Sequence, residues 1–132
     1  MERAAVLFDM DGVTIDTEPL YTKAEIRLFR EYGIEIPEED FSLFRGCSEK
    51  MFFDLSMERY GISEDPNIFI EKGRKYVLEE FNKNIPFVKG FKAFHNWVTE
   101  FYHVGLVTAS PKESLSFISK KVGLDNYFKH MI

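Results

Sequence analysis

The sequence predicts an α/β fold with a parallel sheet, on the strength of three observations. Ala4–Phe8 is a short, continuous apolar run, which is typical of a buried strand. Val104–Val107 is a second run of this kind. The residues between the two runs carry apolar residues at helical spacing, and parallel strands need helical crossovers of this sort.

The long segment between the two runs predicts a block of four helices. Each combines a start signal with a stop signal or a break in the pattern. The four helices are predicted over 17–32, from 37 onward, over 49–60, and from 65 to about 82. A block of this length exceeds a simple crossover. We therefore expect a separate helical domain over 17–86, inserted into an α/β core over 1–16 and 87–132.

Two further helices are predicted around the second strand. One covers Phe91–Tyr102, and its aromatic side chains recur at helical intervals, so that Phe91, Phe94, Trp97 and Phe101 are all expected in the core. The other covers Lys112–Val122 and is ended by Gly123. The three histidines have no metal-ligand spacing and are expected in core or surface positions.

Composition excludes several classes of protein. The chain has 132 residues and a net charge of -5, which argues against a general nucleic-acid binder. No apolar run approaches the length of a membrane span. Only five apolar residues stand between Arg3 and Asp9, so a signal peptide is not expected, and the single cysteine excludes an internal disulfide. We expect a cytoplasmic protein that binds neither nucleic acid nor membrane.

Two carboxylates, Asp9 and Asp11, follow the first predicted strand. Residues i and i+2 of an extended chain point the same way, so both can face one site at the end of the strand. Two like charges held together favour a cation, and oxygen ligands suit Mg²⁺. The alternative is a capping or turn role for the two aspartates. A calcium loop of the EF-hand type is excluded because Val13 and Leu20 stand where it needs acids.

These residues also carry a family resemblance. The segment 8–13, Phe-Asp-Met-Asp-Gly-Val, with Asp16-Thr17-Glu18 after it, resembles the first motif of the haloacid dehalogenase (HAD) superfamily. The segment 105–110 is similar to its second motif. The subgroup it is most similar to contains phosphoglycolate phosphatase-like enzymes and β-phosphoglucomutase. The resemblance implies a partial Rossmann-like HAD core with an inserted helical cap domain.

The resemblance implies a role for each matching residue. Asp9 would be the nucleophile that forms an aspartyl-phosphate, and Asp11 would be the general acid and then the general base. Mg²⁺ would be bound by Asp9 and by the main-chain carbonyl of Asp11. Thr108 would donate its hydroxyl to the phosphoryl group, aided by backbone N–H groups near Gly12 and Ala109.

The resemblance also implies residues that bind substrate. Gly12, Ala109 and Ser110 would do so in the core. The segment 44–48 is similar to the family's cap loop, so that Arg45 and Gly46 would reach the substrate; a solvated surface role for Arg45 is the alternative. Thr17 falls where related enzymes have a hinge-region hydroxyl, although an N-cap role explains it nearly as well.

Phosphoryl transfer is favoured over dehalogenation because the dehalogenase branch lacks the second aspartate. Tyr21 stands where the mutase has a histidine, and Glu49 where it has a phosphate-binding arginine. Both departures favour a Mg²⁺-dependent phosphatase of small phosphorylated metabolites. A sugar phosphomutase and a non-catalytic binding or regulatory product remain alternatives.

Two further family motifs, a lysine and an acidic loop, have no match. Lys120, Lys121 and Lys129 precede the third strand, which 128–132 approaches, and so cannot be the lysine. We therefore expect a chain truncated before these motifs, and inactive or weakly active. The family's sheet order would leave Ala4–Phe8 as an unpaired edge, which predicts self-association.

Overall fold

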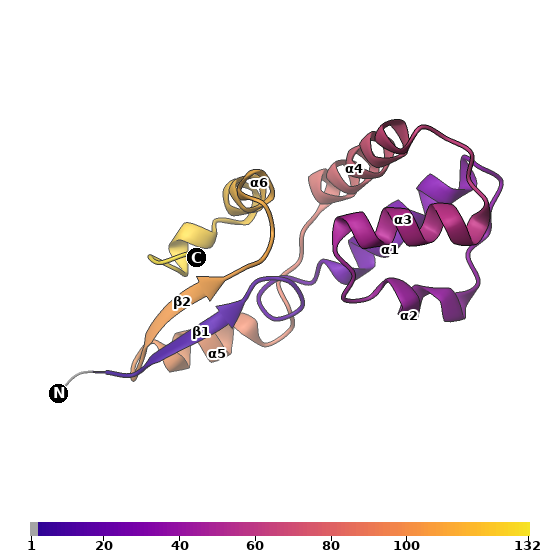
Figure 1. Cartoon of the computed structure of the whole chain (residues 1–132). Helices are drawn as coiled ribbons and strands as arrows, with labels where there is room; N and C mark the ends of the chain where they lie inside the picture. The colour runs from indigo at the N-terminus through magenta and orange to yellow at the C-terminus, as the bar shows by residue number, and fades with distance from the viewer. Residues whose placement is uncertain (1–2) are drawn as a thin grey trace. The chain divides into compact units, whose positions relative to one another are not determined.

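The computed structural model describes residues 3–132, which form two compact units (Figure 1). The sheet unit contains the residues up to Pro19 together with Phe81–Ile132, and the helical unit contains Leu20–Glu80. The sheet unit carries parallel strands joined through helices, so the predicted α/β class is confirmed. In the part of the chain that the structure describes, no helix is both long enough and apolar enough to cross a membrane.

The sheet consists of two parallel strands, β1 (Ala5–Asp9) and β2 (His103–Val107), which lie side by side in Figure 1. The end of the chain approaches the other side of β2. The Leu106 N–H donates to the His130 carbonyl at 2.9 Å, and the Ile132 N–H donates to the Leu106 carbonyl at 2.8 Å. The predicted approach to a third strand is thus confirmed. Within residues 3–132, β2 is paired on both sides and β1 on one.

Two helices, α5 (Phe91–Val98) and α6 (Lys112–Val122), belong to the sheet unit. Phe8 of β1 is buried, and its ring lies 5.6 Å from that of Phe91 and 5.5 Å from that of Phe128. His95 is also buried here, with its Nε2 2.7 Å from the Tyr127 carbonyl oxygen. This aromatic cluster fixes α5 against β1 and the segment after α6 through edge-to-face contacts.

The predictions for α5 are partly wrong. The helix ends at Val98 instead of Tyr102, because the next residues form tight turns and the Thr99 hydroxyl donates to the Asn96 carbonyl at 2.9 Å. Of the four aromatic residues expected in the core, only Phe91 is buried. The other three are about half exposed, at 50% for Phe94, 55% for Trp97 and 53% for Phe101.

The helical unit is built from α1 (Glu18–Arg30), a 3₁₀ turn (Glu38–Asp40), α2 (Phe41–Phe44), α3 (Glu49–Tyr60) and α4 (Pro66–Lys83). The bounds of α3 agree with the predicted ones. Ser48 caps it by accepting a hydrogen bond from the Met51 N–H at 3.2 Å, and Gly61 ends it in the left-handed conformation at φ 61°. The helix predicted from Pro37 onward is instead the 3₁₀ turn followed by a single short turn of α-helix.

The core of the helical unit is aromatic. Leu28, Phe29, Phe53 and Phe69 are its buried members. Phe29 is fully buried, and its ring lies 5.3 Å from that of Tyr60 and 6.0 Å from that of Phe69. Burial of one such ring contributes about 1.5–3 kcal/mol, so this cluster stabilises the packing of α1, α3 and α4.

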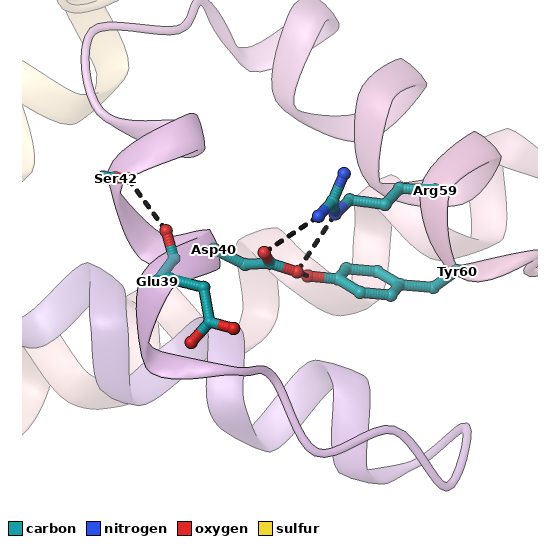
Figure 2. A network of polar contacts seen from close by, with 5 residues as sticks. All are labelled: Glu39, Asp40, Ser42, Arg59 and Tyr60. Carbon is teal, nitrogen blue, oxygen red and sulfur yellow. Dashed lines mark hydrogen bonds and ion pairs between the residues drawn. The ribbon is translucent and has the colours of Figure 1, made fainter.

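A buried carboxylate joins the 3₁₀ turn to α3 (Figure 2). Asp40 is only 4% exposed. The Arg59 guanidinium donates to both of its oxygens, each at 3.0 Å, and the Tyr60 hydroxyl donates to Oδ2 at 2.6 Å. These bonds hold the pKa of Asp40 below its usual range, chiefly through the bond from Arg59 and then through that from Tyr60.

Candidate active site

The carboxyl ends of β1 and β2 meet at one edge of the sheet. Asp9 is the last residue of β1 and pairs with Val107, the last residue of β2, so the loop that begins at Thr108 starts beside Asp9. Asp9 is exposed, and its Oδ1 accepts a hydrogen bond from the Met10 N–H at 2.7 Å. The nucleophile predicted from the sequence therefore stands at the edge where ligands bind in open parallel sheets.

The loop after Asp9 folds back on itself. The Thr14 hydroxyl donates to the Asp9 carbonyl at 2.7 Å, and the N–H groups of Thr14 and Ile15 donate to the Met10 carbonyl at 3.1 and 3.0 Å. Gly12 has a φ of 81°, a conformation that side chains with a Cβ rarely adopt. Its N–H donates to the Ile15 carbonyl at 2.8 Å, so in this structure that group serves the loop.

The same loop is anchored to the segment before α5. The Asp16 N–H donates to the Pro86 carbonyl at 2.8 Å, and the Val88 N–H donates to the Thr14 carbonyl at 3.0 Å. Met10 and Ile15 of this loop are fully buried. The two aspartates are thus carried by a backbone that is bonded along most of its length.

Hydroxyl groups hold both oxygens of Asp11. The Thr17 hydroxyl donates to Oδ1 at 2.7 Å, and the Ser110 hydroxyl donates to Oδ2 at 3.2 Å. Thr17 is 1% exposed, whereas Asp11 and Ser110 are half-buried. The structure therefore brings together Asp11, Thr17 and Ser110, three residues that the sequence singled out separately.

Thr108 lies at the other end of this arrangement. Its Oγ1 accepts a hydrogen bond from the Ser110 N–H at 3.0 Å, and its own N–H donates to the Ile132 carbonyl at 3.0 Å. Because the Thr108 oxygen accepts the bond from Ser110, its hydroxyl hydrogen can be directed to another acceptor. Ala109, between the two, is exposed.

The remaining predicted site residues belong to the helical unit. Arg45 and Gly46 form the exposed link between α2 and α3, and Gly46 turns the chain at a φ of 75°. Glu49 begins α3 and accepts two hydrogen bonds from the Arg74 guanidinium, one of them from Nε at 3.0 Å. Tyr21 is half-buried on α1.

Two supporting residues were not predicted from the sequence. Thr14 is fully buried and bonds to the Asp9 carbonyl, and Pro111, at a φ of −58°, follows Ser110 and precedes α6. A threonine inside the loop after the first motif and a proline after Ser110 are visible as residue types. Their contacts, however, appear only when the loops are folded.

The donor set of the site suits a hard cation only in part. Asp9 and Asp11 offer carboxylate and carbonyl oxygens, the ligands that Mg²⁺ prefers. Among residues 3–132 there is no group of three or more acidic, histidine or cysteine side chains that could enclose a metal ion. The two aspartates therefore fit Mg²⁺ as an open site completed by water and substrate oxygens, which is how this ion is commonly bound.

Comparison with known proteins places the chain in the family that its motifs resemble. The profile of the haloacid dehalogenase-like hydrolases matches residues 6–132. A phosphorylated carbohydrates phosphatase from Thermotoga maritima is 30% identical over 97% of this chain and 60% of its own length. A 6-phosphogluconate phosphatase from Escherichia coli is 26% identical over 94% of this chain and 56% of its own. The chain thus spans little more than half the length of these relatives.

Solved structures share the fold. A Thermotoga maritima protein provisionally named a β-phosphoglucomutase superimposes with a TM-score of 0.80 at 27% identity, over 97% of this chain and 60% of that one. With matches of this extent, and with both first-motif aspartates at the strand edge, the chain belongs to the haloacid dehalogenase-like hydrolases.

Proposed function

We propose that this chain carries the nucleophile and the general acid–base residue of a Mg²⁺-dependent phosphatase that acts on small phosphorylated metabolites in the cytoplasm. The observation that carries the proposal is the position of Asp9 at the strand edge, next to the start of the Thr108 loop and two residues from Asp11. The names of two relatives, a phosphorylated carbohydrates phosphatase and a 6-phosphogluconate phosphatase, favour sugar phosphates as substrates.

The reaction would proceed in two balanced steps. An oxygen of Asp9 attacks phosphorus, the bond to the substrate oxygen breaks, and Asp11 gives its proton to that leaving oxygen. Asp11, now a carboxylate, then takes a proton from water as the water oxygen attacks phosphorus. The acyl-phosphate bond breaks, and inorganic phosphate and the Asp9 carboxylate are released. Thr108 would donate its hydroxyl to the phosphoryl oxygens in both steps.

The carboxylate of Asp9 and the main-chain carbonyl of Asp11 would hold the ion. When bound, Mg²⁺ neutralises phosphoryl charge that would otherwise repel the carboxylate nucleophile.

The helical unit would act as a cap domain, with predicted bounds 17–86, and Arg45 and Gly46 would contact the substrate from its α2–α3 loop. Glu49, which is paired with Arg74, supports a phosphatase over a sugar phosphomutase, because by the family resemblance its carboxylate stands where the mutase has an arginine. A non-catalytic binding product is the other alternative, and it differs from both enzymes in giving no turnover.

Phosphate release tests the proposal. The 132-residue chain, in which the lysine and acidic-loop motifs have no match, is expected to release phosphate only slowly from an aryl phosphate and from 6-phosphogluconate with Mg²⁺. Excess chelator should reduce the rate by about 10²-fold or more, because the phosphoryl charge is then left uncompensated. Metal-independent release would contradict the proposal, and no release from any phosphate ester even at high protein concentration would favour the non-catalytic alternative. Isomerisation of a sugar 1-phosphate to the 6-phosphate without release would identify a mutase instead.

Self-association is proposed from the edge of the sheet. Within residues 3–132, β1 pairs only with β2, and Leu7 on it is 60% exposed. Unpaired apolar edges pair with other chains, and a charge on the edge opposes this. We expect the weight-average mass by light scattering to rise with concentration, and Leu7→Lys to suppress the rise. A wild-type chain that stays monomeric at high concentration would contradict this.

A further inference from the structure

Ser110 contacts both of the groups that would act on the substrate. Its main-chain N–H donates to Thr108 Oγ1 at 3.0 Å, and its side-chain hydroxyl donates to Asp11 Oδ2 at 3.2 Å. One residue of the loop after β2 is therefore bonded both to the threonine that would donate a hydrogen bond to the phosphoryl group and to the acid–base carboxylate. That carboxylate is 99 positions away in the sequence.

The bonds to Asp11 restrict its carboxyl group but leave lone pairs of its oxygens available. Ser110 and Thr17 each use one lone pair of a different oxygen, and each carboxylate oxygen has two. A lone pair remains on each oxygen to carry or receive the proton of the reaction. Two donors on separate segments fix both the χ1 angle of Asp11 and the orientation of its carboxyl plane, which a single donor does not.

The backbone of Ser110 is itself restricted. Pro111, with φ −58° and ψ 154°, follows it directly and precedes the first turn of α6. A residue before proline is largely confined to extended conformations. Ser110 therefore presents its hydroxyl to Asp11 from a backbone that has few alternatives, and little conformational entropy is lost when the bond forms.

We propose that Ser110 is a positioning residue that orients Asp11 toward the leaving oxygen, and not a ligand of the substrate. The proposal rests on the proposed function, because Asp11 has a leaving oxygen to protonate only if this chain is a phosphatase. Its consequence for the first step is selective, since loss of the Ser110 hydroxyl impairs phosphoenzyme formation only from substrates whose leaving group needs a proton.

Two substrates distinguish a positioning role of Ser110 from a substrate-binding role. A sugar phosphate leaves as an alkoxide and needs the proton, whereas p-nitrophenyl phosphate leaves as a stable phenolate and does not. Ser110→Ala is expected to lower kcat/KM for the sugar phosphate, which covers the steps up to formation of the phosphoenzyme, by about 10- to 100-fold, a share of the 10²–10⁴-fold that general acid catalysis supplies. For the aryl ester, whose leaving group needs no proton from Asp11, kcat/KM should stay within about twofold of wild type.

Three variants control the measurement. Ser110→Thr keeps a hydroxyl and should restore kcat/KM for the sugar phosphate. Ser116→Ala removes an exposed hydroxyl of α6 and should change neither substrate. In an Asp11→Asn background, Ser110→Ala should have no further effect on the sugar phosphate, because residues that act through one another are non-additive. An equal loss of kcat/KM for both substrates, or no change of kcat/KM for the sugar phosphate, would overturn the positioning role.

A readout independent of turnover keeps this inference separate from the proposed function. Three-bond couplings from Cγ of Asp11 to the backbone nitrogen and carbonyl carbon report its χ1 angle in isotopically labelled protein. The wild-type chain should give the couplings of one rotamer, Ser110→Ala averaged values, and Ser110→Thr the wild-type pattern. Wild-type couplings in Ser110→Ala would overturn the inference whether or not the chain turns over. Absence of phosphate release from wild type would count against the proposed function alone.

Discussion

Replacing Asp9 with asparagine is expected to abolish phosphate release, with a loss of about 10³-fold or more. Asparagine has nearly the same shape and keeps an oxygen that can accept the hydrogen bond now donated by the Met10 N–H at 2.7 Å. It lacks the negative charge that attacks phosphorus. The loss should therefore appear in kcat while the fold is retained, and steady-state kinetics with circular dichroism would measure both.

A covalent trap gives this prediction a second measurement. Wild-type protein quenched in acid during turnover should carry the added mass of one phosphoryl group on the peptide that contains Asp9, and Asp9→Asn should carry none. Asp125→Asn is a suitable control because Asp125 is an exposed carboxylate of the same unit, far along the chain from the motif. Wild-type rates in Asp9→Asn, or the added mass on a different peptide, would show that Asp9 is not the nucleophile.

Replacing Asp40 with asparagine is expected to produce the largest loss of stability among polar substitutions in the helical unit. Asp40 is 4% exposed and accepts three hydrogen bonds from Arg59 and Tyr60 (Figure 2). Asparagine removes the charge that compensates the guanidinium and turns one acceptor into a donor that faces it. We expect the thermal midpoint to fall by roughly 5–10 °C.

The pH dependence of stability should follow the same network. The folded-state pKa of Asp40 is lowered by the bonds from Arg59 and Tyr60, so its contribution is present above the unfolded value near 4 and is lost as the pH falls through the folded value. Burial first, and then the bond to Asp40, raise the pKa of Tyr60 to about 12. Its contribution is complete below the unfolded value near 10 and is lost as the pH rises through the folded value.

Denaturation midpoints measured from acid to alkaline pH would test this. Wild type should keep its full stability between about pH 4 and 10, and Asp40→Asn should lose less than wild type on acidification. Asp54→Asn is the matched control, because Asp54 pairs with Lys50 at an exposed site with side-chain exposures of 65% and 85%. Such pairs contribute little. Equal effects of the two substitutions would contradict a special role for Asp40.

Local signals explain which helices could be predicted. The bounds of α3 and α6 were predicted because each ends at a glycine, Gly61 and Gly123, that adopts the left-handed conformation. The end of α5 was missed because Tyr102 and its neighbours keep helical spacing while turns replace the helix. Helical spacing at Phe94 and Trp97 also suggested burial, but burial depends on which element packs against a face, and spacing carries no information about that.

The sequence alone determined the α/β class, the strand that carries Asp9 and Asp11, and the family motif, because these follow from residues close together in the chain. Only the tertiary structure decided what those aspartates contact. The pairing of β1 with β2 brings the loop after β2 beside the first motif, so that Ser110 reaches Asp11 across 99 positions. The bonds from Arg59 to Asp40 likewise depend on how the helices pack. Helix packing and strand register determine such contacts, and a local sequence pattern predicts neither of them.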